Sequence, residues 1–174
     1  MLPAHTCDRP RIPAAIRGAE AGDKRSSHLY LKNGPPVKHM IVSRQRPILN
    51  SPQQVYEYLQ KILAKLDKID RDKEHFYVII LTARNQVKLT ELVSLGTANA
   101  SLVHPREVFR RAIHLGAISI IVAHNHPSGD PEPSAADLEV TRRLTEAGKL
   151  IGIEVLDHVI VGKNTFYSAA KNYR

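Results

Sequence analysis

The fold is decided by the stretch Ile118-Ser119-Ile120-Ile121-Val122-Ala123-His124-Asn125-His126-Pro127-Ser128-Gly129-Asp130-Pro131. Its first six residues are a short apolar run rich in β-branched side chains, which predicts a buried strand. Residues two apart on a strand project from the same face, so His124 and His126 can direct both imidazoles at one point. The glycine and prolines that follow stiffen the loop. Because open sheets tend to place ligands at strand ends, the sequence predicts a functional site here.

The segments on either side of this stretch alternate between helix and strand patterns. Ser51 can cap a helix that Pro52 begins, and Gln54 can close a capping box. The predicted elements are a helix over 52–66, a charged linker at 67–73, strands at 76–81 and 87–93 joined by a turn at 83–86, a helix from 105 that Gly116 ends, a strand at 118–123, a helix that Ser134 starts, and strands at 153–161 and 165–168 around a turn at 162–164. This order predicts an α/β fold with a mixed sheet flanked by helices.

Apolar residues mark the faces that these helices are expected to bury. They are Val55, Leu59, Ile62 and Leu66 in the first helix, Val108, Phe109, Ala112 and Ile113 in the second, and Leu138, Leu144 and Leu150 in the third. Of the histidines on these elements, His75 and His114 are expected to be partly exposed.

The composition is that of one soluble domain, with 174 residues of which 43% are hydrophobic and 24% charged. No apolar run approaches the roughly 18 residues of a membrane helix, and the N-terminus does not read as a secretory signal. The single cysteine, Cys7, suits a reducing compartment and cannot supply a cysteine-rich cluster. We therefore expect a cytoplasmic protein without a membrane segment, in which any metal is held by His, Asp or Glu.

The formal net charge of +8 is concentrated at the N-terminus. Residues 1–47 carry nine Lys and Arg against three acidic residues, and the prolines at 3, 10, 13, 35 and 36 interrupt them. This pattern predicts an extended basic arm ahead of a domain at 48–174. Such an arm can contact nucleic acid through phosphates, or it can be a solvating tail without interleaved aromatic residues to stack on bases.

A third metal-ligating side chain follows the two histidines. Asp137 comes eleven residues after His126, in the first turn of the predicted third helix. Two imidazoles and one carboxylate leave a tetrahedral zinc ion with an open fourth position, as hydrolytic zinc sites require. Two alternatives stay open: the histidines can be ordinary polar loop residues, and Ser134 with Asp137 can be a purely structural capping box.

The same residues carry a resemblance to a known family. The run His124 to Pro131, followed by Pro133-Ser134 and Asp137, resembles the metal-binding signature of the JAB/MPN (JAMM) domain in its bacterial RadC branch. That signature is a glutamate, then H-x-H, seven residues, and S-x-x-D. The similarity continues through Gly96-Thr97, through 104–109 and through 156–162, so it covers about residues 47–174. It implies a JAB/MPN fold related to cytidine deaminases, one zinc ion (Zn2+) per chain, and a metallopeptidase or isopeptidase activity.

The resemblance also implies a role for each matching residue. His124, His126 and Asp137 match the zinc ligands, and Ser134 matches the residue that steadies the oxyanion. An upstream acid matches the general base that takes a proton from the metal-activated water. We favour Glu74, immediately before the first buried strand, over Glu91 and Glu107, because a base must be held rigidly near that water.

The chain departs from the family pattern in two places. Residues 1–47 show no helix-hairpin-helix pair, so the DNA-contacting module of full-length RadC-type proteins is absent or replaced by the basic arm. Asn125 stands where the deubiquitinating branch has Ser or Thr, which argues against ubiquitin-like substrates. The peptide or isopeptide substrate and the oligomeric state are not predicted.

The same residues argue against two other enzyme classes and leave one non-enzymatic function open. A nucleobase deaminase needs H-x-E and P-C-x-x-C, which this chain lacks, and an HNH nuclease disperses its three residues over a larger unit. A non-enzymatic DNA-associated module, linked to DNA repair and carrying a structural or vestigial metal, stays open. His104 and His158 lie within the resemblance and can be either structural or supporting residues of the site.

Overall fold

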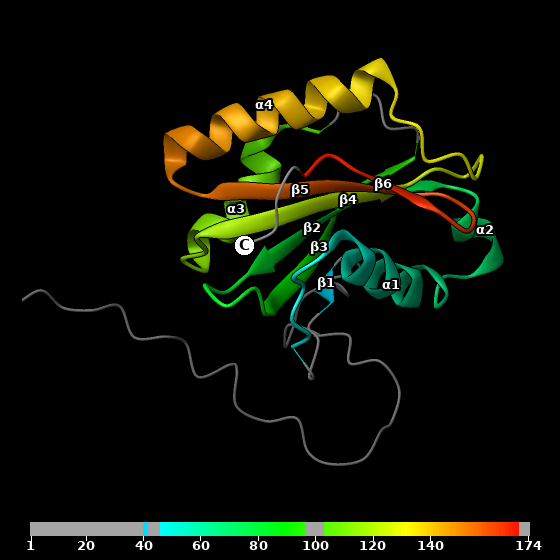
Figure 1. Ribbon diagram of the computed structural model, residues 1–174, viewed down its shortest axis with the longest axis horizontal. Helices are drawn as coiled ribbons and strands as arrows, with labels where there is room; N and C mark the ends of the chain where they lie inside the picture. The colour runs from blue at the N-terminus through cyan, green and yellow to red at the C-terminus, as the bar shows by residue number, and fades with distance from the viewer. Residues whose placement is uncertain (1–39, 42–45, 97–102, 171–174) are drawn as a thin grey trace, which may run out of the picture.

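The computed structural model describes residues 40–41, 46–96 and 103–170, which form a mixed sheet with helices on both faces (Figure 1). The sheet has the strand order β1-β3-β2-β4-β5-β6, in which only β4 and β5 are parallel. The strands are β1 (Met40–Ile41), β2 (Glu74–Leu81), β3 (Val87–Gly96), β4 (Ser119–Asn125), β5 (Glu154–Val161) and β6 (Phe166–Ser168). The helices are α1 (Pro52–Leu63), α2 (Lys68–Arg71), α3 (Pro105–His114) and α4 (Ala135–Ile151). The predicted mixed α/β architecture is confirmed.

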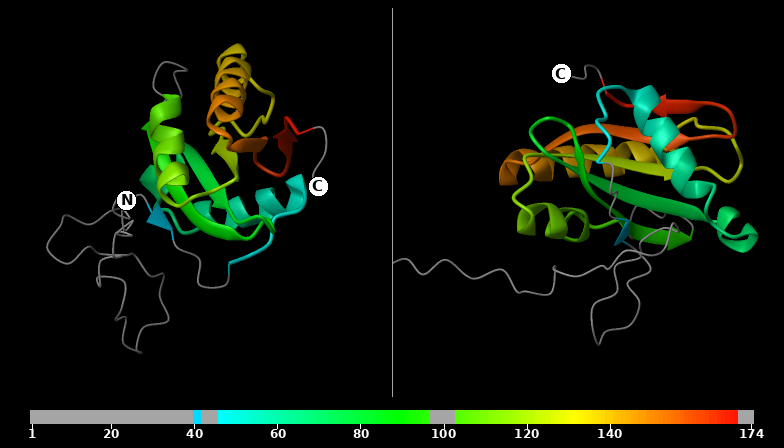
Figure 2. Two further views of the ribbon diagram at one scale, coloured as in Figure 1. Left: turned by 90° about the vertical axis from the view of Figure 1, so that its left-hand side faces the viewer. Right: turned by 90° about the horizontal axis from the view of Figure 1, so that it is seen from below.

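Two hydrophobic cores lie on opposite faces of the central strands. One face of β2 packs Val78 and Ile80 against α3 and α4, and the other packs Ile79 and Leu81 against α1. Figure 2 shows α3 and α4 together on one side of the sheet and α1 on the other. Because β2 and β4 are covered on both faces, their sequences are continuous apolar runs without polar alternation.

Helix α4 is the crossover that makes β4 and β5 parallel, since parallel neighbours need a connection of this kind. It begins with a complete capping box, in which Ser134 accepts from the backbone N–H of Asp137 and the Asp137 carboxylate accepts from the N–H of Ser134. Near its end, Gly148 lies so close to the next strand that an added Cβ would clash with the carbonyl oxygen of Ile153. The cap therefore fixes the start of the helix, and its end lies close against the sheet.

Four apolar residues that were expected in the core are exposed instead. Leu138 and Leu150 are 51% and 88% exposed, because a spacing of six residues does not keep leucines on one helical face. The face that α4 buries carries Asp137, Val140, Leu144 and Gly148. Ile113 is 58% exposed in the last turn of α3, and Ile118 is 55% exposed because β4 begins one residue later.

Two further details of the predicted elements were wrong. The expected linker at 67–73 contains the one-turn helix α2, which Asp67 caps by accepting from the N–H of Asp70. His75 was expected to be partly exposed, yet it is only 2% exposed because β2 already lies inside the sheet at that residue.

The predicted basic arm, 1–47, lies outside the described residues except for β1 and positions 46–47. The two residues of β1 pair with β3, with Met40 opposite Glu91 and Ile41 opposite Thr90. Among the described residues, no helix combines the length and the apolar character needed to cross a membrane.

Candidate metal centre

Four metal-ligating side chains from three elements meet at the end of β4. Glu74 is the first residue of β2, His124 is in β4, His126 follows β4 directly, and Asp137 is in the first turn of α4. One ligand atom from each of these residues lies within 4.8 Å of the others. The structure therefore brings together the two histidines and the aspartate that the sequence singled out, and Glu74 with them.

The shortest distances all involve the ring nitrogens. The Nε2 atom of His124 is 3.0 Å from Nε2 of His126, 3.2 Å from Oδ1 of Asp137 and 3.6 Å from Oε1 of Glu74. The Nε2 atom of His126 is 3.5 Å from Oδ2 of Asp137. The His124 side chain is fully buried and that of Asp137 is 8% exposed, whereas those of Glu74 and His126 are 16% and 17% exposed. The group is thus enclosed on one side and reachable from the other.

Asn125 holds the end of β4 against the beginning of β2. Its Oδ1 atom accepts a hydrogen bond of 2.9 Å from the backbone N–H of His75, and its Nδ2 atom donates one of 3.0 Å to the carbonyl of Lys73. These two peptide groups flank Glu74. At the same point β4 pairs with β5, since Asn125 lies opposite Val161. One side chain therefore fixes the backbone on both sides of the candidate base.

The loop after β4 holds His126 by its other ring nitrogen. Nδ1 of His126 is 2.7 Å from the backbone carbonyl of Asp130. A carbonyl can only accept, so Nδ1 carries the hydrogen and, in the neutral ring, Nε2 presents a lone pair to the group. The loop is itself fixed, because the N–H of Lys163 donates to the carbonyl of Gly129 at 2.9 Å and a Cβ at Gly162 would lie 2.5 Å from that oxygen.

Asp137 caps α4 and faces the histidines at the same time. Its Oδ2 atom accepts from the backbone N–H and the hydroxyl of Ser134, at 2.8 and 2.6 Å, while Oδ1 faces His124. Burial alone would raise the pKa of Asp137, but the nearby His124 and the hydrogen bonds from Ser134 lower it below its ordinary value. The carboxylate is therefore ionised at neutral pH. The structural capping box and a ligand role are compatible, because they use different oxygens.

The two other acids considered from the sequence lie elsewhere. Glu91, on β3, is 3.6 Å from Nε of Arg111 and 3.9 Å from Nη2 of Arg110. Glu107, on α3, is paired with Arg106 and Arg110 at 3.6 and 3.5 Å. His104 is the N-cap residue of α3. None of these three residues belongs to the four-residue group.

The sequence did not predict the supporting roles of Thr141 and Asn125, and it left open whether His158 supports the site. His158, on β5, places Nε2 2.9 Å from Nδ1 of His124 and places Nδ1 2.6 Å from the hydroxyl of Thr141. Burial, with a smaller contribution from the nearby His124, lowers the pKa of His158 to about 3. The spacing of four residues from Asp137 to Thr141 on one helix was a usable signal. The role of Asn125 was not, since it depends on residues about fifty positions earlier in the chain.

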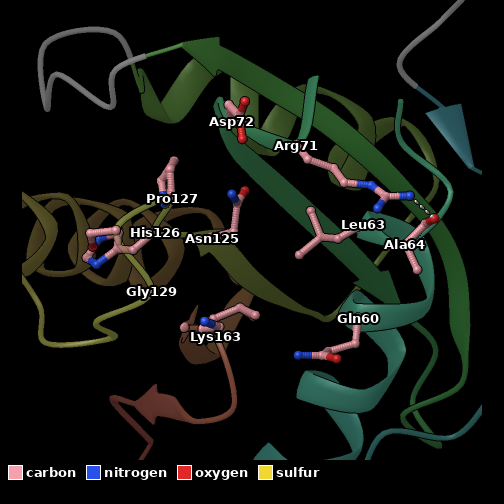
Figure 3. Close-up of a pocket in the computed structure, with 13 residues that line it drawn as sticks. Gln60, Leu63, Ala64, Arg71, Asp72, Asn125, His126, Pro127, Gly129 and Lys163 are labelled. Carbon is pink, nitrogen blue, oxygen red and sulfur yellow. Dashed lines mark hydrogen bonds between the residues drawn. The ribbon is translucent and has the colours of Figure 1, made fainter. Parts of the chain in front are cut away.

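A pocket of about 750 Å³ opens beside His126 (Figure 3). One wall is the end of α1 with Gln60, Leu63 and Ala64, and α2 adds Arg71 and Asp72. Facing them are the loop 125–129 and residues 161–163. The Arg71 guanidinium is held by the backbone carbonyls of Ala64 and Leu66, each at 2.9 Å, so α2 and the end of α1 form one wall. Of the four grouped residues, His126 lines this pocket.

The four residues fit a divalent metal ion. Two imidazoles and two carboxylates supply only nitrogen and oxygen donors, which suit zinc and related ions. Nε2 of His126 presents a lone pair near the ionised carboxylate of Asp137, and Nε2 of His124 is only 3.0 Å from Nε2 of His126. Such a concentration of electron pairs in a buried place is stabilised by a cation at its centre.

Comparison with known proteins agrees with this geometry. The family model described as "RadC-like JAB domain" matches residues 49–173. A UPF0758 protein of Desulfitobacterium hafniense is 48% identical over 123 residues, which are 71% of this chain and 52% of that protein. A UPF0758 protein of Rubrobacter xylanophilus is 52% identical over 132 residues, or 75% of this chain and 56% of that protein. The chain thus spans about half the length of these curated relatives.

Proposed function

Because this chain belongs to the RadC-like JAB domain family, we propose that it is a metal-dependent hydrolase that cleaves a peptide or isopeptide bond, with zinc as its ion. The observation that carries the proposal is the convergence of Glu74 with His124, His126 and Asp137 within 4.8 Å, beside an open pocket. A merely structural metal site has no need of a further carboxylate or of an adjoining pocket.

His124, His126 and Asp137 would hold the ion. When bound, zinc supplies a positive charge that lowers the pKa of a water molecule and polarises a carbonyl group. The protein contributes fixed ligands: His124 is on a buried strand, Asp137 is held by the helix cap, and His126 is held by the Asp130 carbonyl. Ligands placed on rigid elements keep their geometry during the reaction.

Glu74 would act as the general base. It stands on the first residue of β2, with the flanking peptide groups fixed by Asn125, so its carboxylate has a defined position. We assign it two steps: it receives a proton from the attacking water at a carboxylate oxygen, and it later delivers that proton to the leaving amine.

Ser134 would stabilise the oxyanion. Its hydroxyl now donates to Oδ2 of Asp137, so this role requires the hydroxyl hydrogen to turn toward the developing negative charge. Removing one such donor typically costs about 3 kcal/mol in the transition state.

The proposal is tested first by metal content and then by hydrolysis. Wild type and His126→Ala are dialysed against a weak chelator, and metal is measured by mass spectrometry. We expect about one zinc per chain in wild type and loss of zinc in the variant. Glu74→Gln should bind zinc as wild type does and lose hydrolysis in a screen of peptide and isopeptide substrates.

Each outcome decides between two functions. Unchanged turnover in Glu74→Gln would remove Glu74 from the base role. Absence of metal from wild type would overturn the hydrolase and favour the DNA-associated alternative, for which the nine Lys and Arg of residues 1–47 are the supporting observation. Salt-dependent DNA binding by the full chain would then be the next measurement.

A further inference from the structure

A buried chain of hydrogen bonds links His124 to Asp137, two of the four grouped residues, through side chains outside the group. Nδ1 of His124 is 2.9 Å from Nε2 of His158, and Nδ1 of His158 is 2.6 Å from Oγ1 of Thr141. The Thr141 hydroxyl donates to the backbone carbonyl of Asp137 at 2.7 Å. We call His158 and Thr141 together the relay. It joins β4, β5 and α4.

The direction of every hydrogen bond in the relay follows from its last acceptor. The Asp137 carbonyl can only accept, and the Thr141 hydroxyl has a single hydrogen to give it. Thr141 must therefore accept from His158, which places the hydrogen of His158 on Nδ1. Because His158 is buried, where an unpaired charge is costly, its ring is neutral, and its Nε2 atom is a lone pair that accepts from Nδ1 of His124.

We propose that the relay fixes a hydrogen on Nδ1 of His124 and thereby leaves Nε2 as the ligating atom, so that His158 and Thr141 are positioning residues of the site. This inference rests on the proposed function for its purpose, but the proton positions themselves can be measured in the metal-free protein. Metal-bound histidines commonly have their second nitrogen fixed by a partner, which sets both tautomer and ring orientation.

The opposite direction would place a hydrogen where the ion belongs. Nε2 of His124 lies 3.0 Å from Nε2 of His126 and 3.2 Å from Oδ1 of Asp137. If Nδ1 of His124 accepted instead of donating, its neutral ring would carry the hydrogen on Nε2, inside the group, and metal would have to displace it. The ring cannot avoid this by turning freely, because Phe76 packs against both imidazoles with centroid distances of 5.8 and 5.6 Å.

A single hydroxyl group controls the direction, which suggests a conservative test. Thr141→Val keeps a β-branched side chain of similar size and removes only the acceptor of His158 Nδ1. His158 should then carry its hydrogen on Nε2 and donate to His124, which reverses the relay. Thr141→Ser keeps the hydroxyl and should behave as wild type.

The chain offers a matched control on the same helix. The hydroxyl of Thr145 donates to the carbonyl of Thr141 at 2.8 Å, which is the same bond one turn later, and none of the ring contacts of the described histidines involves Thr145. Thr145→Val therefore makes the identical substitution, with the identical loss of a backbone contact, outside the relay.

The measurements are the protonation of the imidazole nitrogens by NMR on 15N-histidine-labelled, metal-free full chain, and zinc affinity by competition with a chelator. In wild type, Thr141→Ser and Thr145→Val we expect Nδ1 of His124 to be protonated. In Thr141→Val we expect that nitrogen to lose its hydrogen and zinc affinity to fall about 10- to 100-fold.

Three outcomes separate the relay from the proposed function. An unprotonated Nδ1 of His124 in wild type overturns the relay, and so does a Thr141→Val spectrum that matches Thr145→Val. Proton positions as expected in a wild type that binds no zinc support the relay while overturning the hydrolase.

Discussion

Acidification should destabilise the protein through His158 in a way that one substitution removes. The His158 ring is buried, and its pKa is lowered to about 3, whereas an unfolded histidine titrates near 6.5. The unfolded chain therefore binds a proton at this residue between those two values and the folded chain does not. Stability from this group is complete above pH 6.5 and is lost as the pH falls toward 3.

The size of the effect follows from the two pKa values. For a single group with these values, the free energy of unfolding at pH 6 is about 0.8 kcal/mol below that at high pH. At pH 5 the loss is about 2 kcal/mol. The loss at pH 5 is nearly the same for any folded-state pKa of His158 well below 5.

The assay is urea unfolding of metal-free wild type and His158→Gln at pH 7.5 and pH 5. Other titrating groups contribute to both proteins, so the quantity of interest is the difference between their losses. We expect wild type to lose about 2 kcal/mol more than the variant. Parallel losses in the two proteins, or an NMR titration of His158 with a midpoint near 6.5, would refute the reasoning.

Three further predictions test other parts of the structure. Zinc at one hundred times its dissociation constant should raise the free energy of unfolding by about 2.7 kcal/mol, measured by thermal unfolding with and without chelator, and His126→Ala should show no such increase. Gly148→Ala should lower stability by about 1–3 kcal/mol in urea, because its Cβ would clash with the carbonyl of Ile153; wild-type stability would contradict that close approach. Asn125→Ala should speed hydrogen exchange at the His75 amide, whose acceptor is the Asn125 side chain, and unchanged protection there would show that another acceptor suffices.

Much of the fold could be predicted because its central strands are recognisable in the sequence. β2 and β4 are buried on both faces, so each is a continuous run of apolar residues that local pattern alone reveals. The start of α4 was equally visible, since Ser134 and Asp137 have the spacing of a capping box. The burial of individual helix residues was less predictable, because the face that α4 buries includes the polar Asp137 and leaves Leu138 and Leu150 exposed.

The candidate site also has a part that the sequence predicts and a part that it does not. His124, His126 and Asp137 lie within fourteen positions of one another, so strand and helix periodicity was enough to predict their convergence. The relay was not accessible from the sequence, because it depends on the parallel register of β4 and β5. That register places His158 opposite Val122, on the same face as His124 two residues further along.

The two-residue strand β1 bears on how the protein should be prepared. It lies before residues 49–173, which match the family model, yet it hydrogen-bonds to β3 as the outermost strand of the sheet. A chain shortened to the matched residues would lose this pairing and leave β3 unpaired at Thr90 and Glu91 along its outer side. Exposed edges of this kind recruit strands from other molecules, so the shortened chain should self-associate and precipitate more readily than one that begins before Met40.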